Sequence, residues 1–158
     1  MYTKSDLLRD LAAMNIDPNG TLLVHSSVKA VGAVEGGAEA ILDALCDYMQ
    51  NGLLILPTHT WRQMNETYTV FDSRTEPSCV GALTNLFMKR DGVVRSLHPT
   101  HSVAARGADA ESYTAGEELT TTPCARNGCW GKLYDRRAQI LFLGCSLKSN
   151  TYLHGVEE

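Results

Sequence analysis

Residues 21–57 read TLLVHSSVKAVGAVEGGAEAILDALCDYMQNGLLILP, and this stretch decides the fold class. The run TLLVHSS, residues 21–27, is apolar and then enters small polar residues, which is typical of a buried strand that ends in a loop. Ala38–Met49 has apolar residues at helical spacing and is followed by a turn signal. A second apolar run, LLILPTHTW, occupies residues 53–61. Strand, loop, helix and strand in this order predict a parallel α/β sheet.

The flanking sequence extends this pattern in both directions. Thr3–Met14 is predicted as a helix that Thr3 or Ser5 can cap, and Gln139–Leu143 as a third strand. Residues 62–79 lack apolar periodicity and are predicted as a long loop, a kind of segment that is often functional. Further predicted elements are a helix at Val80–Lys89, an extended segment from Val93 to His101, a strand at Ser102–Ala105, a helical or looped segment at Ala108–Glu117 and a short helix at Trp130–Tyr134. We therefore expect residues 1–158 to form one α/β domain whose central sheet is largely parallel or mixed and is flanked by helices.

Composition and charge narrow the function classes. The chain has 158 residues, of which 44% are hydrophobic and 20% are charged, as in a globular domain. Its formal net charge of -4 argues against a nucleic-acid-binding protein, which needs a basic surface, and is compatible with a pocket for a cationic small molecule. The sequence shows neither a signal peptide nor an apolar run of about 18 residues, so we predict a cytoplasmic protein without a membrane span.

The five cysteines do not form a metal-binding pattern. Cys124 and Cys129 are separated by four residues, and no second pair of cysteines accompanies them. An odd number of cysteines, some inside apolar runs, indicates buried or incidental thiols in a reducing compartment. We therefore predict no zinc site.

The first stretch that could carry chemistry follows the first strand. Ser26 and Ser27 enter a loop that contains glycines, among them Gly36, just before a helix. The N–H groups at a helix N-terminus suit a phosphate, and small residues let a backbone approach a pyrophosphate. The pattern matches neither of the common glycine-rich nucleotide motifs. A tight turn between a strand and a helix explains it equally well.

A second polar stretch is RSLHPTHSVAARG, residues 95–107. His98 and His101 are three residues apart, as metal ligands often are, but there is no acidic third ligand nearby and Pro99 disfavours a helix. We therefore interpret the segment as a loop that holds an anionic or polar ligand.

The third stretch is NTYLHGVEE, residues 150–158. If a helix begins here, His154 and Glu157 lie on one face, and the carboxylate can hold one ring nitrogen while the other takes a proton. A histidine held in this way is a common general base near neutral pH. A helix start with a favourable glutamate and an incidental histidine is the alternative, and the sequence leaves both open.

Together these stretches resemble the aminoglycoside 3-N-acetyltransferase family, which has the antibiotic N-acetyltransferase fold and differs from the GNAT acetyltransferases. The resemblance runs from about Thr3 to the last residue and rests on five blocks in order. The blocks are LLVHSSVKAVGAVEGG, LLILPTHTW, FDSRTEPSCVGALTNLFMKRDGVVRSLHPTHSVAARG, TPCARNGCWGKLYDRRAQILFLG and NTYLHGVEE.

The resemblance implies transfer of an acetyl group from acetyl-coenzyme A to an amino group of a 2-deoxystreptamine antibiotic, with antibiotic resistance as the associated role and without a metal. It places the coenzyme against the loop after the first strand, the helix start near Gly36 and the second polar stretch. The implied coenzyme-binding residues are His25, Ser26, Ser27, Val28, Gly36, Arg95, Ser96, His98 and Ser102.

The family's THxxE-like element matches Thr151, His154 and Glu157, so the resemblance assigns His154 as the general base of a direct transfer and Glu157 as its orienting partner. Asp72 either contacts a substrate ammonium or the histidine, or it caps the turn at FDSR, and both alternatives stay open. Backbone N–H groups or a serine or threonine hydroxyl would stabilise the oxyanion. A route through an acylated cysteine is disfavoured, because no cysteine stands beside a histidine in the sequence.

Two departures from the family pattern affect these expectations. GCWGKL, residues 128–133, has Cys129 where the family pattern suggests a Ser-Pro pair. Family members are also considerably longer, so we expect this chain to be the N-terminal portion of a longer family domain. An inactive or truncated coenzyme A-binding domain is therefore the alternative to an active enzyme. The acceptor and the oligomeric state are not predicted.

Overall fold

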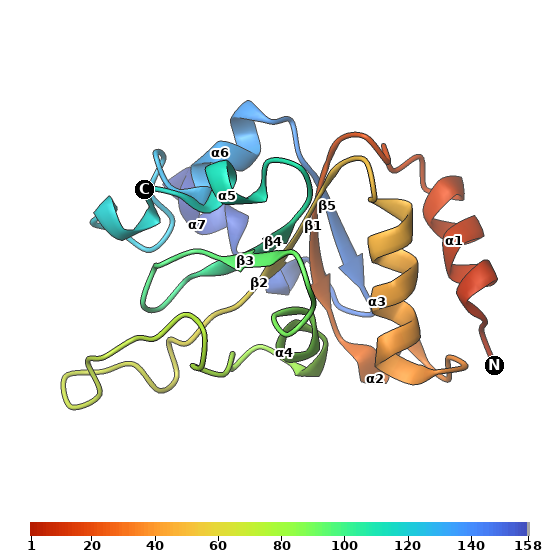
Figure 1. The fold of residues 1–158 in the computed structure, drawn as a ribbon, viewed down its shortest axis with the longest axis horizontal. Helices are drawn as coiled ribbons and strands as arrows, with labels where there is room; N and C mark the ends of the chain where they lie inside the picture. The colour runs from red at the N-terminus through yellow and green to blue at the C-terminus, as the bar shows by residue number, and fades with distance from the viewer. Residues whose placement is uncertain (158) are drawn as a thin grey trace.

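The computed structural model describes residues 1–157 and contains a five-stranded sheet (Figure 1). The strands are β1 (Thr21–Ser26), β2 (Leu53–Pro57), β3 (Val93–Arg95), β4 (Val103–Arg106) and β5 (Gln139–Leu143), in the spatial order β3-β4-β2-β1-β5. β1 pairs in parallel with β2 and β5, whereas β4 pairs antiparallel with β2 and β3. The prediction of an α/β fold is confirmed, and the sheet is mixed.

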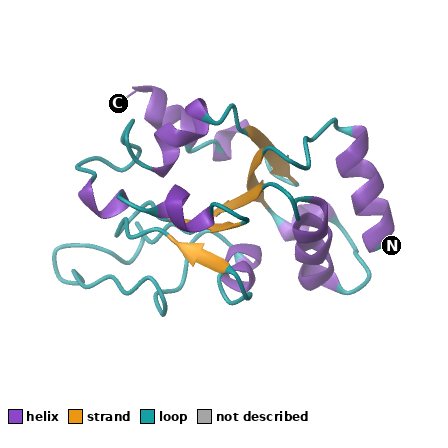
Figure 2. Cartoon of the chain, turned by 45° about the horizontal axis from the view of Figure 1, so that its top comes forward, coloured by secondary structure: helices purple, strands orange, loops and turns teal. Residues whose placement is uncertain are grey.

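Helices cover both faces of this sheet (Figures 1 and 2). One face carries α1 (Lys4–Ala13), α2 (Val28–Val31), α3 (Gly37–Tyr48) and α4 (Ala82–Phe87). The other carries α5 (Ala110–Thr114), α6 (Cys129–Asp135) and α7 (Tyr152–Glu157), with the short 3-10 helices η1 (Glu117–Leu119) and η2 (Leu147–Ser149) nearby in the sequence. Within residues 1–157, none of the helices combines the length and the apolar composition that crossing a bilayer requires.

The apolar runs of β1 and β2 are explained by burial on both faces. Side chains of a strand alternate between the two sides of a sheet. Leu22 and Val24 therefore join the core beneath α1 and α3, whereas Leu23 joins the core beneath α6, where Trp130 is fully buried. A strand buried on both faces needs an apolar residue at every position, which is why this sequence reads as a run and does not alternate.

The observed elements differ from the predicted ones mainly at their ends. The strand predicted for residues 53–61 stops at Pro57, but the chain continues beside the segment before β4. The Thr58 N–H donates to the Ser102 carbonyl at 2.8 Å, and the Thr60 N–H donates to the Thr100 carbonyl at 2.9 Å. This continuation carries residues 58–60 beyond the sheet edge, where they are buried.

The helix α1 and the long loop follow the prediction. Thr3 caps α1: its Oγ1 accepts from the Asp6 N–H at 3.2 Å, and the Asp6 carboxylate accepts from the Thr3 N–H at 2.9 Å. Residues 62–79 contain neither helix nor strand and project from the body of the molecule beyond β2 (Figure 1). The extended segment predicted from Val93 is a strand only to Arg95, and Pro99 lies in the turn that follows.

Candidate active site

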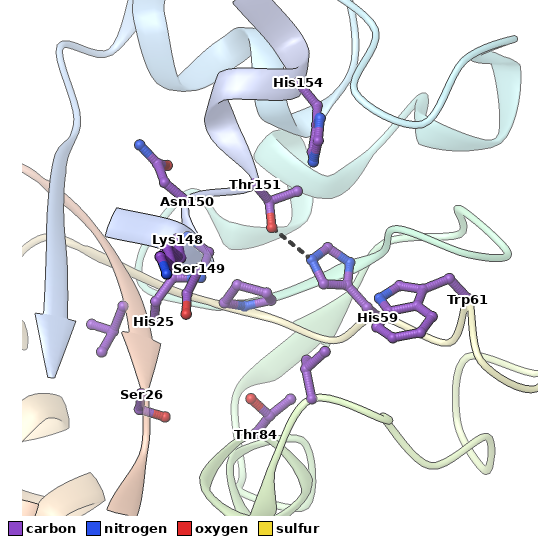
Figure 3. Close-up of a pocket in the computed structure, with 13 residues that line it drawn as sticks. His25, Ser26, His59, Trp61, Thr84, Lys148, Ser149, Asn150, Thr151 and His154 are labelled. Atoms are coloured by element: carbon purple, nitrogen blue, oxygen red, sulfur yellow. Dashed lines mark hydrogen bonds between the residues drawn. The ribbon is translucent and has the colours of Figure 1, made fainter. Parts of the chain in front are cut away.

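A cavity of about 270 Å³ lies where β1 and β2 end and where η2 leads into α7 (Figure 3). In open α/β sheets, ligands bind at this carboxyl edge of the parallel strands. The lining residues are Val24, His25, Ser26, Pro57, His59, Trp61, Val80, Thr84, Lys148, Ser149, Asn150, Thr151 and His154. The fold therefore brings polar groups from the first two strands together with the last segment of the chain.

α7 places His154 in the wall of this cavity (Figure 3). Its Nδ1 lies 3.7 Å from Oε2 of Glu157, one helical turn further on, and the two side chains are 67% and 78% exposed. This distance permits an ion pair when the imidazole is protonated, but it exceeds a hydrogen bond. The two residues lie on one helical face, as expected for a helix beginning here, and their catalytic roles stay predictions.

His154 also lines a second cavity, of about 300 Å³, together with Glu157. His101, Pro123 and Cys124 complete the lining of this second cavity. One imidazole thus borders two spaces, one at the sheet edge and one beside a carboxylate. A group in this position can accept a proton from a molecule in either space.

His25 stands at the end of β1 and is buried. Its ring stacks on Phe142, with the ring centroids 5.4 Å apart, and on Trp130, with the centroids 6.4 Å apart. Burial lowers the pKa of His25 to about 4, so the ring is neutral near pH 7. Its Nε2 is buried without a hydrogen-bond partner, although the residue lines the cavity.

His59, beyond the end of β2, is a site residue that the sequence analysis did not single out. Its Nε2 lies 3.1 Å from the Thr151 hydroxyl oxygen (Figure 3), and its ring stacks on Trp130 with the centroids 5.5 Å apart. Burial, reinforced by neighbouring histidines, lowers the pKa of His59 to about 3. The polar run that follows the buried strand at Pro57 was the available signal, because polar groups at a strand's carboxyl end often belong to a site.

The loop after β1 contributes only part of its predicted residues to the cavity. His25 and Ser26 line it, whereas Ser27 and Val28 do not. Ser27 precedes α2, and Val28 packs against the core beneath α1 and α3. Gly36, with a φ of 80°, is the left-handed residue just before α3, and it also lies outside the cavity lining. Coenzyme contact by these residues stays a prediction.

The second polar stretch forms a buried network. The Arg95 guanidinium donates to the Thr58 carbonyl at 2.8 Å and to the Ser102 hydroxyl at 3.1 Å, and it also bonds the Glu76 carbonyl. Ser96 Oγ accepts from the Val103 N–H at 3.0 Å. Burial lowers the pKa of Arg95 to about 10, which still leaves the guanidinium charged near pH 7.

His98 holds the turn that follows β3. Its Nδ1 accepts from the Thr100 N–H at 3.1 Å and from the His101 N–H at 2.9 Å. Arg95, Ser96, His98 and Ser102 are all outside the cavity lining, and their observed bonds fix the position of residues 58–60 and 95–103. Their predicted contact with the coenzyme therefore stays a prediction.

Asp72 lies in the exposed part of the long loop. Its Oδ1 accepts from the Arg74 backbone N–H at 2.9 Å, and its carboxylate pairs with the Arg74 guanidinium at 3.1 Å. These bonds lower the pKa of Asp72 to about 2. The turn-capping alternative describes these contacts, and a contact between Asp72 and a substrate stays a prediction.

None of the five cysteines forms a disulfide. Cys124 and Cys129 are fully buried, and burial raises the pKa of the Cys129 thiol well above its ordinary value. A thiol in this state is a poor nucleophile, because the thiolate is the reactive form. Within residues 1–157, no group of three or more histidine, cysteine, aspartate or glutamate side chains is arranged to hold a metal ion.

Comparison with known proteins reveals curated relatives over nearly the whole chain. The chain is 28% identical to an SPbeta prophage-derived aminoglycoside N(3')-acetyltransferase-like protein, YokD, of Bacillus subtilis, across 98% of this chain and 64% of the relative. It is 30% identical to aminoglycoside N(3)-acetyltransferase IV of Salmonella, across 99% of this chain and 59% of the relative. The chain therefore spans about 60% of the length of these curated relatives.

Solved structures show the same fold. The complex of AAC-IIIb with CoASH is 26% identical, with a TM-score of 0.88, and the match covers 98% of this chain and 64% of that one. A complex of aminoglycoside acetyltransferase AAC(3)-IVa with apramycin is 28% identical, with a TM-score of 0.88, covering 99% and 62%. A model of the family described as aminoglycoside 3-N-acetyltransferase matches residues 23–158. Because that match takes in most of the sequence, this chain belongs to the aminoglycoside 3-N-acetyltransferase family.

Proposed function

We propose that this protein transfers an acetyl group from acetyl-coenzyme A to an amino group of an aminoglycoside, with His154 as the general base. The observation that carries the proposal is the position of His154 in the cavity at the carboxyl edge of β1 and β2. Family membership supports it, as do the CoASH complex of AAC-IIIb and the apramycin complex of AAC(3)-IVa.

The cavity at the sheet edge suits the thioester end of the coenzyme. Three of its lining residues have a buried polar atom without a hydrogen-bond partner among residues 1–157, namely Nε2 of His25, Nδ1 of His59 and Oδ1 of Asn150. Buried polar groups are normally satisfied, so a polar ligand in this cavity is the natural partner of such atoms. The pantetheine arm of coenzyme A carries amides, which can donate to an oxygen such as that of Asn150. Lys148, also in the lining, supplies a positive charge for an anionic coenzyme.

The second cavity suits the amine. Glu157 borders it beside His154, and a carboxylate attracts an aminoglycoside ammonium. An amine bound there and a thioester bound at the sheet edge would meet at the imidazole that lines both spaces. The two ligands therefore require no movement of His154 from one cavity to the other.

The reaction follows from this arrangement. A protonated amine has no lone pair, so the ammonium first loses one proton to water. The neutral imidazole of His154 then takes a second proton from the nitrogen as it attacks the thioester carbonyl. A carbon–nitrogen bond forms, and the carbonyl oxygen becomes an oxyanion. The carbon–sulfur bond then breaks, and the proton held by His154 neutralises the departing thiolate to give the free thiol of coenzyme A. Glu157 stabilises the transient imidazolium.

The chemistry of the acetylated antibiotic explains how this reaction would cause resistance. Acetylation replaces a charged ammonium of the antibiotic with a neutral amide, which removes one positive charge and changes its hydrogen-bonding groups. We therefore propose aminoglycoside resistance as the consequence in the cell. Five cysteines that form no disulfide support a reducing, cytoplasmic setting for the reaction.

The test uses the purified 158-residue chain with acetyl-coenzyme A and a panel of aminoglycosides that includes apramycin. We expect thiol release that depends on the antibiotic, and a product whose mass has increased by one acetyl group. Calorimetric titration with coenzyme A alone separates binding from turnover. Binding without thiol release would contradict catalysis by this chain and favour an inactive coenzyme-binding domain. Absence of both would contradict the proposal altogether.

A further inference from the structure

The hydroxyl of Thr151 is held by the buried imidazole of His59. Nε2 of His59 lies 3.1 Å from Oγ1 of Thr151, and no other hydrogen bond to that hydroxyl occurs among residues 1–157 (Figure 3). The His59 side chain is buried against Trp130, whereas Thr151 lies at the start of α7 in the cavity lining. The buried ring of His59 thus orients the hydroxyl of Thr151, a residue that lines the proposed thioester site.

The surroundings of His59 select one of its two neutral forms. Nδ1 of His59 is buried and has no hydrogen-bond partner, so one form would bury an unpaired N–H and the other an unpaired lone pair. Buried N–H groups without an acceptor are rare in proteins, and buried acceptors without a donor are somewhat less rare. The form with the hydrogen on Nε2 is therefore favoured, and it donates that hydrogen to Oγ1 of Thr151.

This donation decides where the hydroxyl hydrogen of Thr151 points. A threonine hydroxyl that accepts a hydrogen bond still has one hydrogen to donate, and it directs that hydrogen away from the donor. Because Thr151 lines the cavity, the free direction is toward the bound ligand. His154 stands three residues later on the same helical turn and lines the same cavity.

We propose that the Thr151 hydroxyl donates a hydrogen bond to the oxyanion that forms on the thioester carbonyl, and that His59 is the positioning residue that aims it. This inference rests on the acetyl transfer proposed above and adds a residue for a step in that reaction. The oxyanion donor immediately precedes α7 and the base lies in its first turn, so they approach the reacting carbon together.

The buried state of His59 supports a constant orientation. Burial, together with His101, His25, His98 and His154, lowers the pKa of His59 to about 3. The ring therefore stays neutral near pH 7 and keeps a single N–H. An imidazolium would also donate from Nδ1, which has no acceptor to receive it.

Nuclear magnetic resonance tests the orientation without relying on activity. Long-range proton–nitrogen correlation spectra of the labelled chain distinguish the two neutral forms of each histidine, and the signals lost in His59→Gln identify residue 59. We expect the hydrogen of His59 on Nε2, both near pH 7 and near pH 5. A hydrogen on Nδ1 would overturn the inference, because Thr151 would then donate to His59 and have no hydrogen for the oxyanion.

Kinetics tests the oxyanion role with a matched pair of variants. Thr151→Val removes the hydroxyl at nearly constant size and should lower kcat about 10²–10³-fold, as the loss of one oxyanion donor does. KM for acetyl-coenzyme A should change little, because the bond forms only in the transition state. Thr151→Ser, which keeps a hydroxyl, should recover most of kcat. An undiminished kcat in the valine variant, or an equal loss in the serine variant, would overturn the inference.

A second pair tests His59 as the positioning residue. His59→Leu fills the space without an N–H and should lower kcat on the order of tenfold. His59→Gln can place an amide N–H near the position of Nε2 and should restore part of the loss. Melting temperature and coenzyme A binding serve as folding controls for all four variants. If the unmodified chain lacked turnover, the proposed function would fail, while the resonance experiment would still decide the orientation of Thr151.

Discussion

Two regions meet at the cavity and hold their histidines differently. At the ends of β1 and β2, His25 and His59 are 6% and 4% exposed and stack on aromatic rings. On α7, the side chain of His154 is 67% exposed, and the Glu157 carboxylate is 3.7 Å away. The strand region is part of the core, whereas α7 lies against it from outside.

Under the proposed function, buried and exposed histidines have different roles. Burial disfavours a charged ring, so His25 and His59 remain neutral and can only donate or accept hydrogen bonds in fixed directions. The ring of His154 is exposed and lines both cavities, which is the position that the proposed general base requires. Under the proposed function, the strand region orients polar groups and α7 transfers the proton.

Replacing His154 is expected to have the largest effect on catalysis. His154→Ala should lower kcat about 10²–10⁴-fold, because a positioned base contributes that much. Thiol release measures the rate, and calorimetry should show coenzyme A binding close to that of the unmodified chain. Leu153→Ala, on the same helix but outside the cavity lining, is the matched control. Near-normal turnover in His154→Ala would show that His154 is not the general base, and the two regions would then not differ in the proposed way.

Acid should destabilise the fold through the buried histidines. Their pKa values are lowered in the folded state, to about 4 for His25 and about 3 for His59, from 6.5 in the unfolded chain. The unfolded state therefore binds more protons below pH 6.5, and stability falls as the pH decreases. The free energy of unfolding should drop by roughly 1 kcal/mol per pH unit for each histidine below that pH.

Urea unfolding near pH 7, pH 6 and pH 5 measures this dependence. The variant His59→Gln lacks one of the two rings whose pKa burial lowers, so its stability should depend on pH less steeply over this range. Keeping the pH above about 5 avoids most of the protonation of ordinary carboxylates. Equal slopes for the variant and the unmodified chain would show that the strand region is not held neutral by burial.

The smallest effect is expected for the carboxylate beside His154. Glu157→Gln removes a charge from an exposed pair whose atoms are too far apart for a hydrogen bond, so kcat should fall less than about tenfold. The loss should shrink further at high salt, which screens an exposed charge. A loss as large as that of His154→Ala, independent of salt, would show that the pair tightens and becomes buried during the reaction.

The sheet could be predicted from the sequence because burial leaves a direct record in it. The run from Leu53 to Leu56 has no polar residue, and a strand covered on both faces admits none. The ends of elements were less certain: β2 stops at Pro57, although the chain keeps hydrogen-bonding to residues 100–102. Such irregular pairing depends on a neighbour that is distant in the sequence, so local patterns do not record it.

The candidate site was only partly predictable for the same reason. His154 and Glu157 were predicted on one helical face, because three-residue spacing is a local property. Arg95 and Ser102 were expected beside a ligand on grounds of polarity, but their side chains bond Thr58 inside the protein. His59 was overlooked, because its partner Thr151 is 92 residues away in the sequence.

The sequence by itself determined the fold class, the family and the helical turn that carries His154. These depend on apolar periodicity, on ordered blocks of residues and on spacing along one helix, all of which are local. Only the tertiary structure decided which polar residues face the cavity and which histidines stay neutral. Those properties depend on side-chain direction and on desolvation by neighbours from other parts of the chain, and no local pattern contains them.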